Sequence, residues 1–252
     1  MKIIKELTGY SGSTVLLLHD GVSLRVRKIN NVDRNLERLQ SLQSLDINLP
    51  RVLCQTENSY DMPYIPHQDM ITWLLHNPID HYVDWIISTI EKLQQNSVDW
   101  DWTKVYINRI DTPGLKIHWD QFTFSFEQLI SRLPKILPKS HYHGDLTVEN
   151  CIFGNDGKFY LIDPITTEYA SWIFDIAKLQ QDLVSGWFIR NQDVQLQGKL
   201  WDINSAILHK YPQANNPTLL IAMLLRILPY TQNVTDQQFL INDINRLWHN
   251  NN

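Results

Sequence analysis

The chain lacks the features of several protein classes. It has two cysteines in 252 residues, Cys54 and Cys151, and two distant thiols cannot form a disulfide framework or a cysteine-rich metal cluster. No apolar stretch reaches the roughly 18 residues that cross a bilayer, since the longest, residues 219–228, is interrupted by Arg226. The first residues also lack the apolar core of a signal peptide. We therefore expect a cytoplasmic protein without membrane insertion.

An excess of positive charge is also missing. The 22 basic residues are outnumbered by 27 acidic ones, which gives a formal net charge of −5. Proteins that bind nucleic acids normally carry a concentrated basic face, so we expect no nucleic-acid partner. The 43% of hydrophobic residues is ordinary for a globular protein. A chain of this length can form one large domain or two lobes sharing a cleft.

The N-terminal quarter has the pattern of short strands. Residues 14–18 are apolar, residues 22–29 alternate apolar and polar side chains, and a His-Asp-Gly turn separates them. This pattern predicts an antiparallel hairpin. Residues 49–55 and 59–66 are two further strand candidates.

A helix is predicted between these strands. In residues 30–45, Leu36, Leu39, Leu42 and Leu45 recur at three-residue intervals, as on one face of an amphipathic helix. Glu37 lies off this leucine stripe.

The pattern changes to helix from residue 67 onward. The helix candidates are residues 70–77, 81–95, 123–133, 171–189, 200–211, 218–230 and 237–250. One hairpin, with its turn at residues 154–158, interrupts them. The sequence thus predicts an α+β protein with a β-rich N-terminal lobe, residues 1–66, and a helical C-terminal lobe, residues 67–252.

Polar residues gather around the predicted hairpin. His143, Asp145 and Asn150 precede it within an apolar frame, and Asp163 follows its second strand. Phosphoryl transfer needs a carboxylate to accept the proton of a hydroxyl, and oxygen ligands for magnesium on the nucleotide phosphates. Asp145 suits the first task, and Asn150 and Asp163 suit the second. The alternative is that these residues are ordinary turn and capping residues.

The motif from His143 to Asn150, followed by Leu161-Ile162-Asp163-Pro164, resembles the catalytic segment of the aminoglycoside phosphotransferase and choline kinase superfamily. This superfamily is the small-molecule branch of the protein-kinase-like fold. The resemblance implies a two-lobed fold, a bound ATP or GTP, and Mg²⁺. It implies that Asp145 is the base, that Asn150 and Asp163 bind the metal, and that His143 and Asp175 support the catalytic loop.

The resemblance also predicts the groups that hold the nucleotide phosphates. Ser11, Gly12 and Ser13 match the family's phosphate-covering loop, although an ordinary hairpin turn has the same composition. In the family a lysine on the third strand contacts the phosphates and pairs with a helix glutamate. The best register puts Arg25 in the place of that lysine, with Glu37 as the glutamate candidate.

Strand parity leaves one alternative for the phosphate contact. Arg27 shares the parity of Arg25, whereas Lys28 is expected on the opposite face. Arginine differs from lysine in reach and hydrogen-bonding geometry, so the exchange is a departure from the family pattern. Glu37 is equally well explained as a solvated helix carboxylate beside Arg34 and Arg38.

The strand at residues 59–66 matches the family's interlobe hinge, which binds adenine through backbone groups. By this match Met62 flanks the base, the carbonyl of Pro63 accepts a hydrogen bond, and the N–H of Ile65 donates one. A plain edge strand is the alternative.

The molecule that would accept the phosphoryl group is less well defined by the sequence. Tyr169, Trp172, Asp182 and Trp187 follow the proposed metal aspartate and are candidates to line an acceptor pocket, although tryptophans at helical spacing mostly build cores. The resemblance implies an amino sugar, a sugar conjugate or an amino alcohol such as choline. The helix after Asp175 also resembles kinase-like proteins of bacterial surface-polysaccharide assembly, a fold-level analogy.

Two classes of function are therefore compared. The first is an ATP- and Mg²⁺-dependent kinase of a small hydroxyl compound, and the second is a nucleotide-binding pseudokinase or regulatory scaffold silenced at Arg25. A protein kinase fits less well, because the chain has no Ala-Pro-Glu signature. The acceptor, the choice of ATP or GTP, and the oligomeric state are not encoded in any recognisable motif.

Overall fold

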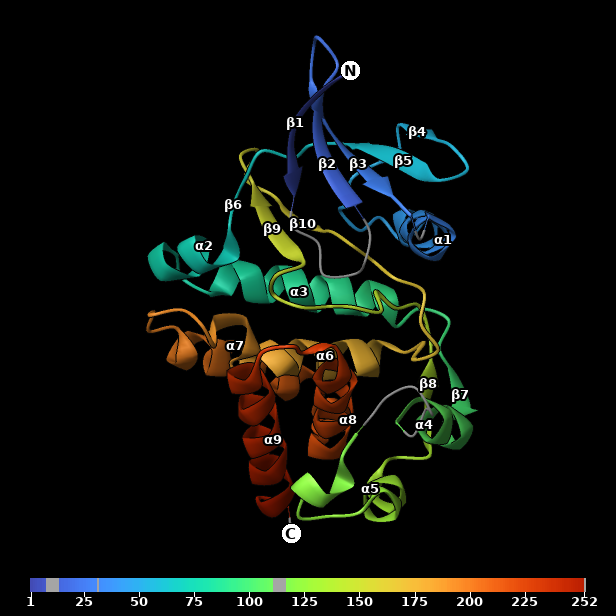
Figure 1. The fold of residues 1–252 in the computed structure, drawn as a ribbon, viewed down its shortest axis with the longest axis vertical. Coiled ribbons are helices and arrows are strands. Elements are labelled where there is room, and N and C mark those ends of the chain that lie inside the picture. The colour runs from blue at the N-terminus through green and yellow to red at the C-terminus, as the bar shows by residue number, and fades with distance from the viewer. Residues whose placement is uncertain (8–13, 31, 111–116, 252) are drawn as a thin grey trace. The chain divides into compact units, whose positions relative to one another are not determined.

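The computed structural model describes residues 1–7, 14–30, 32–110 and 117–251. The chain forms two compact units (Figure 1). The first contains Met1–Lys92 and His143–Thr167, and the second contains Leu93–Tyr142 and residues 168–252. The expected division into lobes at residue 66 stays a prediction.

An antiparallel sheet of five strands forms the N-terminal part of the first unit. Its strands are β1 (Lys2–Leu7), β2 (Thr14–His19), β3 (Leu24–Ile29), β4 (Cys54–Gln55) and β5 (Ser59–Pro63), in the order β1-β2-β3-β5-β4. The alternation of apolar and polar residues in β3 favours a strand with two different faces. The hairpin predicted from this alternation is confirmed by the antiparallel pairing of β2 with β3.

Helix α1 (Val32–Gln43) follows β3 and packs near β5 (Figure 1). Leu36, Leu39 and Leu42 are buried, and Glu37 is exposed. The first three leucines of the predicted stripe therefore form the buried face of this helix, whereas Leu45 lies beyond its end and is half-buried.

A second, three-stranded sheet carries the predicted hairpin. It consists of β6 (His67–Gln68), β9 (Cys151–Gly154) and β10 (Phe159–Leu161), in the order β10-β9-β6. Helices α2 (Met70–His76) and α3 (Asp80–Leu93) supply aromatic side chains beside it. The ring centroid of Phe159 lies 5.0 Å from that of Trp73 and 5.5 Å from that of Tyr82, and both pairs make edge-to-face contacts. This packing fixes the hairpin.

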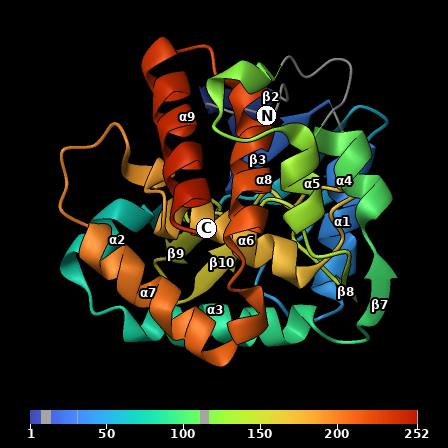
Figure 2. The same cartoon turned by 90° about the horizontal axis from the view of Figure 1, so that it is seen from below.

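The second unit is mainly helical. Its elements are β7 (Val98–Asp101), α4 (Thr103–Ile110), η1 (Trp119–Gln121), α5 (Phe126–Arg132), β8 (Ile136–Lys139), α6 (Trp172–Leu183), η2 (Trp187–Ile189), α7 (Gln197–Lys210), η3 (Pro212–Ala214), α8 (Pro217–Ile227), η4 (Leu228–Tyr230) and α9 (Val234–His249). Helices α8 and α9 lie side by side (Figures 1 and 2). None of the described helices is both long enough and apolar enough to cross a membrane.

Two features of this unit were not expected from the sequence. The aromatic and acidic segment at residues 98–102 begins with strand β7, which pairs with β8, and α4 follows it. The indole of Trp102 is buried and donates a hydrogen bond of 3.0 Å to the carbonyl of Leu137. Trp102 is thus part of the core, whereas the residues of β7 before it are exposed.

Candidate active site

The segment before β9 depends on a glycine. Gly144 has φ +88°, in the left-handed region that favours glycine. A Cβ atom here would lie 2.2 Å from the carbonyl oxygen of Ile165. Close packing and backbone conformation together therefore require glycine between His143 and Asp145.

His143 is fully buried beside this glycine. Its Nδ1 accepts the backbone N–H of Asp145 at 3.3 Å, so Nε2 carries the hydrogen and donates to the carbonyl of Ile162 at 3.0 Å. Burial lowers the pKa of His143 to about 4, although the nearby charge of Asp145 opposes this shift. The neutral imidazole thus ties the segment before β9 to the strand after the turn.

This burial predicts a loss of stability in mild acid. The pKa of His143 is lowered from the ordinary value of about 6.5. Its contribution to the free energy of unfolding is therefore fully present above pH 6.5 and is lost as the pH falls toward 4. We expect the free energy of unfolding, measured with urea, to fall by about 2 kcal/mol between pH 7 and pH 5 from this residue. His143→Gln should lose that part of the pH dependence, and an unchanged slope would contradict the assignment.

Asp145 and Asn150 lie against each other within this segment. The amide nitrogen of Asn150 donates to the Asp145 carbonyl at 2.8 Å and to its carboxylate at 3.0 Å. Because the nitrogen makes both contacts, the amide oxygen of Asn150 remains an acceptor that Asp145 does not use. Both side chains are half-buried.

Asp163 stands at the end of the hairpin in an uncommon conformation. Its φ is +55°, which is unusual for a residue other than glycine and is a feature found at functional sites. The preceding residue, Ile162, donates its N–H to the carbonyl of Asn150 at 2.9 Å. The hairpin backbone therefore fixes Asp163 relative to Asn150.

The basic side chain that reaches Asp163 is Lys28, and this differs from the expected register. Its Nζ lies 2.9 Å from Asp163 Oδ1, and its side chain is only 2% exposed, against 43% for Asp163. The predicted parity is confirmed, because Lys28 does lie on the face opposite Arg25. The face that turns toward Asp163 is the one occupied by Lys28, however, so the geometry favours Lys28 over Arg25 and Arg27 for a phosphate contact.

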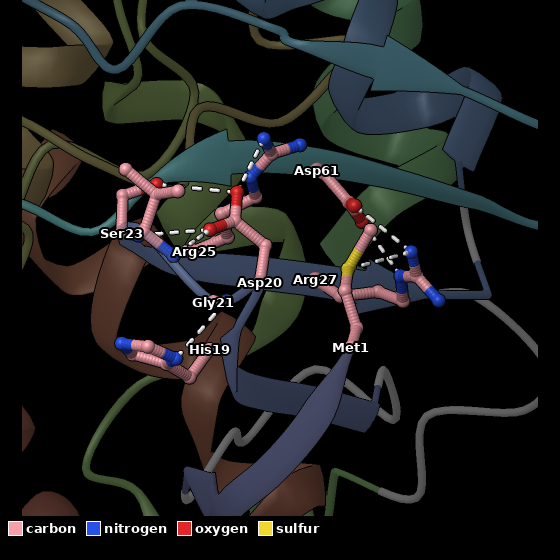
Figure 3. Close-up of polar contacts among 9 residues, drawn as sticks. Met1, His19, Asp20, Gly21, Ser23, Arg25, Arg27 and Asp61 are labelled. Atoms are coloured by element: carbon pink, nitrogen blue, oxygen red, sulfur yellow. Dashed lines mark hydrogen bonds and ion pairs between the residues drawn. The ribbon is translucent and has the colours of Figure 1, made fainter.

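Arg25 and Arg27 are engaged on the other face of the sheet (Figure 3). Arg25 pairs with Asp20 at 2.5 Å, and backbone hydrogen bonds from the β2–β3 turn together with this guanidinium lower the pKa of Asp20. Arg27 makes two contacts with the buried carboxylate of Asp61, at 2.6 and 2.8 Å. Both arginines thus have local carboxylate partners.

Two buried polar residues of the first unit were not predicted from the sequence. Tyr60 on β5 and Asn35 on α1 are each 2% exposed, and the Asn35 side chain acts on the Tyr60 hydroxyl. Burial and the negative charge of Asp163 raise the pKa of Tyr60, so its hydroxyl keeps its proton. Glu37, the expected partner of the phosphate-binding residue, is exposed instead.

The backbone at the predicted hinge leaves two groups directed away from the sheet, as hydrogen bonds to adenine would require. The N–H of Tyr64 donates to the carbonyl of Leu24 at 3.1 Å. Because backbone groups alternate in direction along an extended segment, the Pro63 carbonyl and the Ile65 N–H turn away from β3. Met62 is buried on the same face of the sheet as Lys28. The adenine contacts of these residues stay a prediction.

The remaining expected residues are less informative. Ser11, Gly12 and Ser13 lie outside the described residues. Asp175 is buried in the first turn of α6, and its supporting role stays a prediction.

The four acceptor candidates all lie in the second unit. Tyr169, Trp172 and Asp182 are buried, while Trp187 is partly exposed. The guanidinium of Arg190 lies 3.6 Å from the centroid of the Trp187 ring. Burial favours a core role for the first three, and an acceptor contact stays a prediction for all four.

Comparisons with known proteins identify the family. Residues 4–205 match the phosphotransferase enzyme family, whereas no curated protein matches the chain. The solved aminoglycoside phosphotransferase APH(4)-Ia is similar, with a TM-score of 0.67, 10% identity, and coverage of 97% of this chain and 92% of that chain.

Two other solved structures are similar. A putative fructosamine-3-kinase from Haemophilus somnus has a TM-score of 0.59 and 18% identity, covering 95% of this chain and 90% of that one. An ethanolamine kinase from Plasmodium vivax has a TM-score of 0.60 and 11% identity, covering 95% and 81%. These likenesses establish an α+β kinase-like fold. Since the family match spans most of the sequence, the chain belongs to the phosphotransferase enzyme family.

Proposed function

We propose that this phosphotransferase transfers the γ-phosphoryl group of ATP, with Mg²⁺, to a hydroxyl group of a small molecule. The observation that carries the proposal is the grouping of Asp145, Asn150, Asp163 and Lys28 within the first unit. These side chains supply a base, two oxygen ligands and a cation, which are the groups that phosphoryl transfer requires.

Asp145 is the proposed base. Its carboxylate accepts the Asn150 amide at 3.0 Å, which restrains its orientation. A carboxylate held in this way can accept the proton of an acceptor hydroxyl as the oxygen attacks phosphorus. His143 restrains the same segment through its two hydrogen bonds, so its proposed role is to support the loop.

The donor set near Asp163 fits a magnesium ion. The oxygen of Asn150 and the carboxylate of half-exposed Asp163 are hard oxygen ligands, and Mg²⁺ commonly binds one or two protein oxygens together with phosphates and water. When bound, Mg²⁺ supplies charge neutralisation on the nucleotide phosphates.

The nucleotide would be held by Lys28 and the hinge. The Lys28 ammonium, directed to the same side as Asp163, can contact phosphate oxygens. Met62, Pro63 and Ile65 are the proposed adenine contacts. One solved form of APH(4)-Ia is a ternary complex with AMP-PNP and hygromycin B, which supports a nucleotide site here. The Lys28–Asp163 ion pair favours an active kinase over a pseudokinase silenced at Arg25, because a lysine accompanies Asp163.

The acceptor class is proposed from the relatives. Their names describe kinases of aminoglycosides, fructosamine and ethanolamine. An amino sugar, a sugar conjugate or an amino alcohol such as choline is therefore the proposed acceptor, and a role in bacterial surface-polysaccharide metabolism in the cytoplasm extends this proposal. Trp187, as the partly exposed member of the four candidates, is the first acceptor contact to test.

Release of ADP tests the proposed reaction. The protein would be incubated with ATP, with and without Mg²⁺, and with aminoglycosides, fructosamine, ethanolamine and choline in separate reactions. We expect one acceptor class to raise Mg²⁺-dependent ADP release above the rate measured with the protein and ATP but without an acceptor. ³¹P NMR should then detect the new phosphate ester. Absence of Mg²⁺-dependent ADP release under every condition would contradict the proposal.

A further inference from the structure

We propose that Pro63 and His67 make the hinge selective for adenine nucleotides over guanine nucleotides. Pro63 contributes through the N–H that it lacks, and His67 through a hydrogen bond to the carbonyl of Ile65. The inference rests on the proposed function, because it assumes that the base binds along residues 63–65. His67 acts on the base through the Ile65 carbonyl and is not itself a proposed contact of the base.

Adenine and guanine present their hydrogen-bonding groups in opposite order. The amino group of adenine is a donor beside the acceptor N1, whereas O6 of guanine is an acceptor beside the donor N1–H. The ribose and the phosphates, held toward Lys28 and Asp163, leave the base one orientation. The base that the hinge accepts therefore depends on which backbone groups it offers, and in which order.

The hinge offers a carbonyl followed by an N–H. The N–H of Tyr64 donates to the carbonyl of Leu24 at 3.1 Å, so the backbone groups of the residues on either side of Tyr64 turn away from β3. Within the described residues, neither the Pro63 carbonyl nor the Ile65 N–H takes part in a hydrogen bond. An acceptor beside a donor is the order that the amino group and N1 of adenine require.

Guanine would need the N–H and the carbonyl of one residue, and both such pairs are incomplete. Pro63 has a carbonyl but no N–H. The carbonyl of Ile65 lies 2.7 Å from Nδ1 of His67. Because a carbonyl oxygen only accepts hydrogen bonds, Nδ1 carries the hydrogen and donates it. A guanine N–H would have to share the Ile65 oxygen with this imidazole.

His67 is held in place from two sides. It begins β6, where it pairs with Gly154 of β9. The centroid of its ring lies 5.9 Å from that of Tyr64. The His67 side chain is nevertheless exposed, and exposed side chains can usually be replaced at little cost in stability. A substitution at this position therefore tests selectivity in a folded protein.

The test compares the binding of two nucleotides that differ in the base. Isothermal titration calorimetry with ADP and with GDP, both with Mg²⁺, would be applied to wild type, His67→Ala, His67→Asn and Pro63→Ala. His76→Ala is the matched control, because His76 is also exposed and its Nδ1 lies 2.8 Å from the carbonyl of Thr72 on α2. We expect the wild type to bind ADP about a hundredfold more tightly than GDP, the size of two hydrogen bonds.

The variants should change the binding of GDP and not that of ADP. His67→Ala should tighten GDP binding about tenfold, because the Ile65 carbonyl becomes available for one hydrogen bond. His67→Asn should keep the wild-type ratio, because its amide places a donor as many bonds from the backbone as Nδ1. Pro63→Ala, which restores an N–H, should also tighten GDP binding. His76→Ala should leave both dissociation constants within about twofold of wild type.

Three outcomes would overturn the inference. They are a wild type that binds GDP as tightly as ADP, a His67→Ala protein with the wild-type ratio, and a His76→Ala protein whose ratio changes as much as that of His67→Ala. A wild type that binds neither nucleotide would instead overturn the proposed function, and the inference with it. Because the wild type is measured first, the two failures are distinguishable.

Discussion

Asp145→Asn is expected to lower kcat by on the order of 10³-fold, the usual contribution of a positioned general base. The asparagine keeps the size of the side chain but cannot accept the proton of the attacking hydroxyl. Binding of Mg²⁺-ADP should stay within about twofold of wild type, because Asp145 is not a proposed ligand of the metal. Steady-state kinetics with the acceptor found in the ADP-release assay, together with calorimetry, measures both quantities.

Asp156→Asn is the matched control for this substitution. Asp156 is an exposed carboxylate in the turn of the same hairpin, where it accepts a hydrogen bond of 2.6 Å from the Tyr160 hydroxyl. Its replacement should leave kcat near the wild-type value. A fully active Asp145→Asn protein would show that the proton is accepted elsewhere.

Lys28→Met is expected to lower kcat/KM for ATP by on the order of a hundredfold, as for the loss of a hydrogen bond between charged groups. Methionine fills much of the space of the lysine stem but carries no charge. The folded state should tolerate the change, because the partner left behind, Asp163, is 43% exposed and can be solvated. A melting curve recorded beside the kinetics checks this point.

Arg25→Met distinguishes the observed register from the one expected from the sequence. Arg25 pairs with Asp20 on the opposite face of the sheet. Because a surface ion pair contributes little free energy, the loss of Arg25 should change kcat/KM by less than about threefold. If Arg25→Met abolished activity and Lys28→Met retained it, the phosphate contact would belong to Arg25.

The sequence was sufficient for features that depend on local spacing. The buried leucines of α1 and the hairpin after Asn150 were predicted, because each depends on residues that lie close together in the chain. The connection between Asp163 and Asn150 followed from the pairing of two adjacent strands.

Features that depend on distant contacts were not predictable in the same way. Parity separated Lys28 from Arg25, but β3 carries basic residues on both faces, and only packing decides which face meets Asp163. A signal for Asn35 existed, since it lies four residues before Leu39 on the buried stripe, whereas Glu37 lies off it. The strand β7 was missed because its partner β8 is more than 30 residues away in sequence.

The most direct test of the account is a thermal-shift titration of the wild type with ATP and GTP, with and without Mg²⁺. A nucleotide present at a hundred times its dissociation constant should add about 2.7 kcal/mol to the free energy of unfolding. We expect a rise in melting temperature that requires Mg²⁺ and that is lost in Asp163→Ala. No rise with either nucleotide, or an equal rise in Asp163→Ala, would contradict a metal-dependent nucleotide site at Asp163.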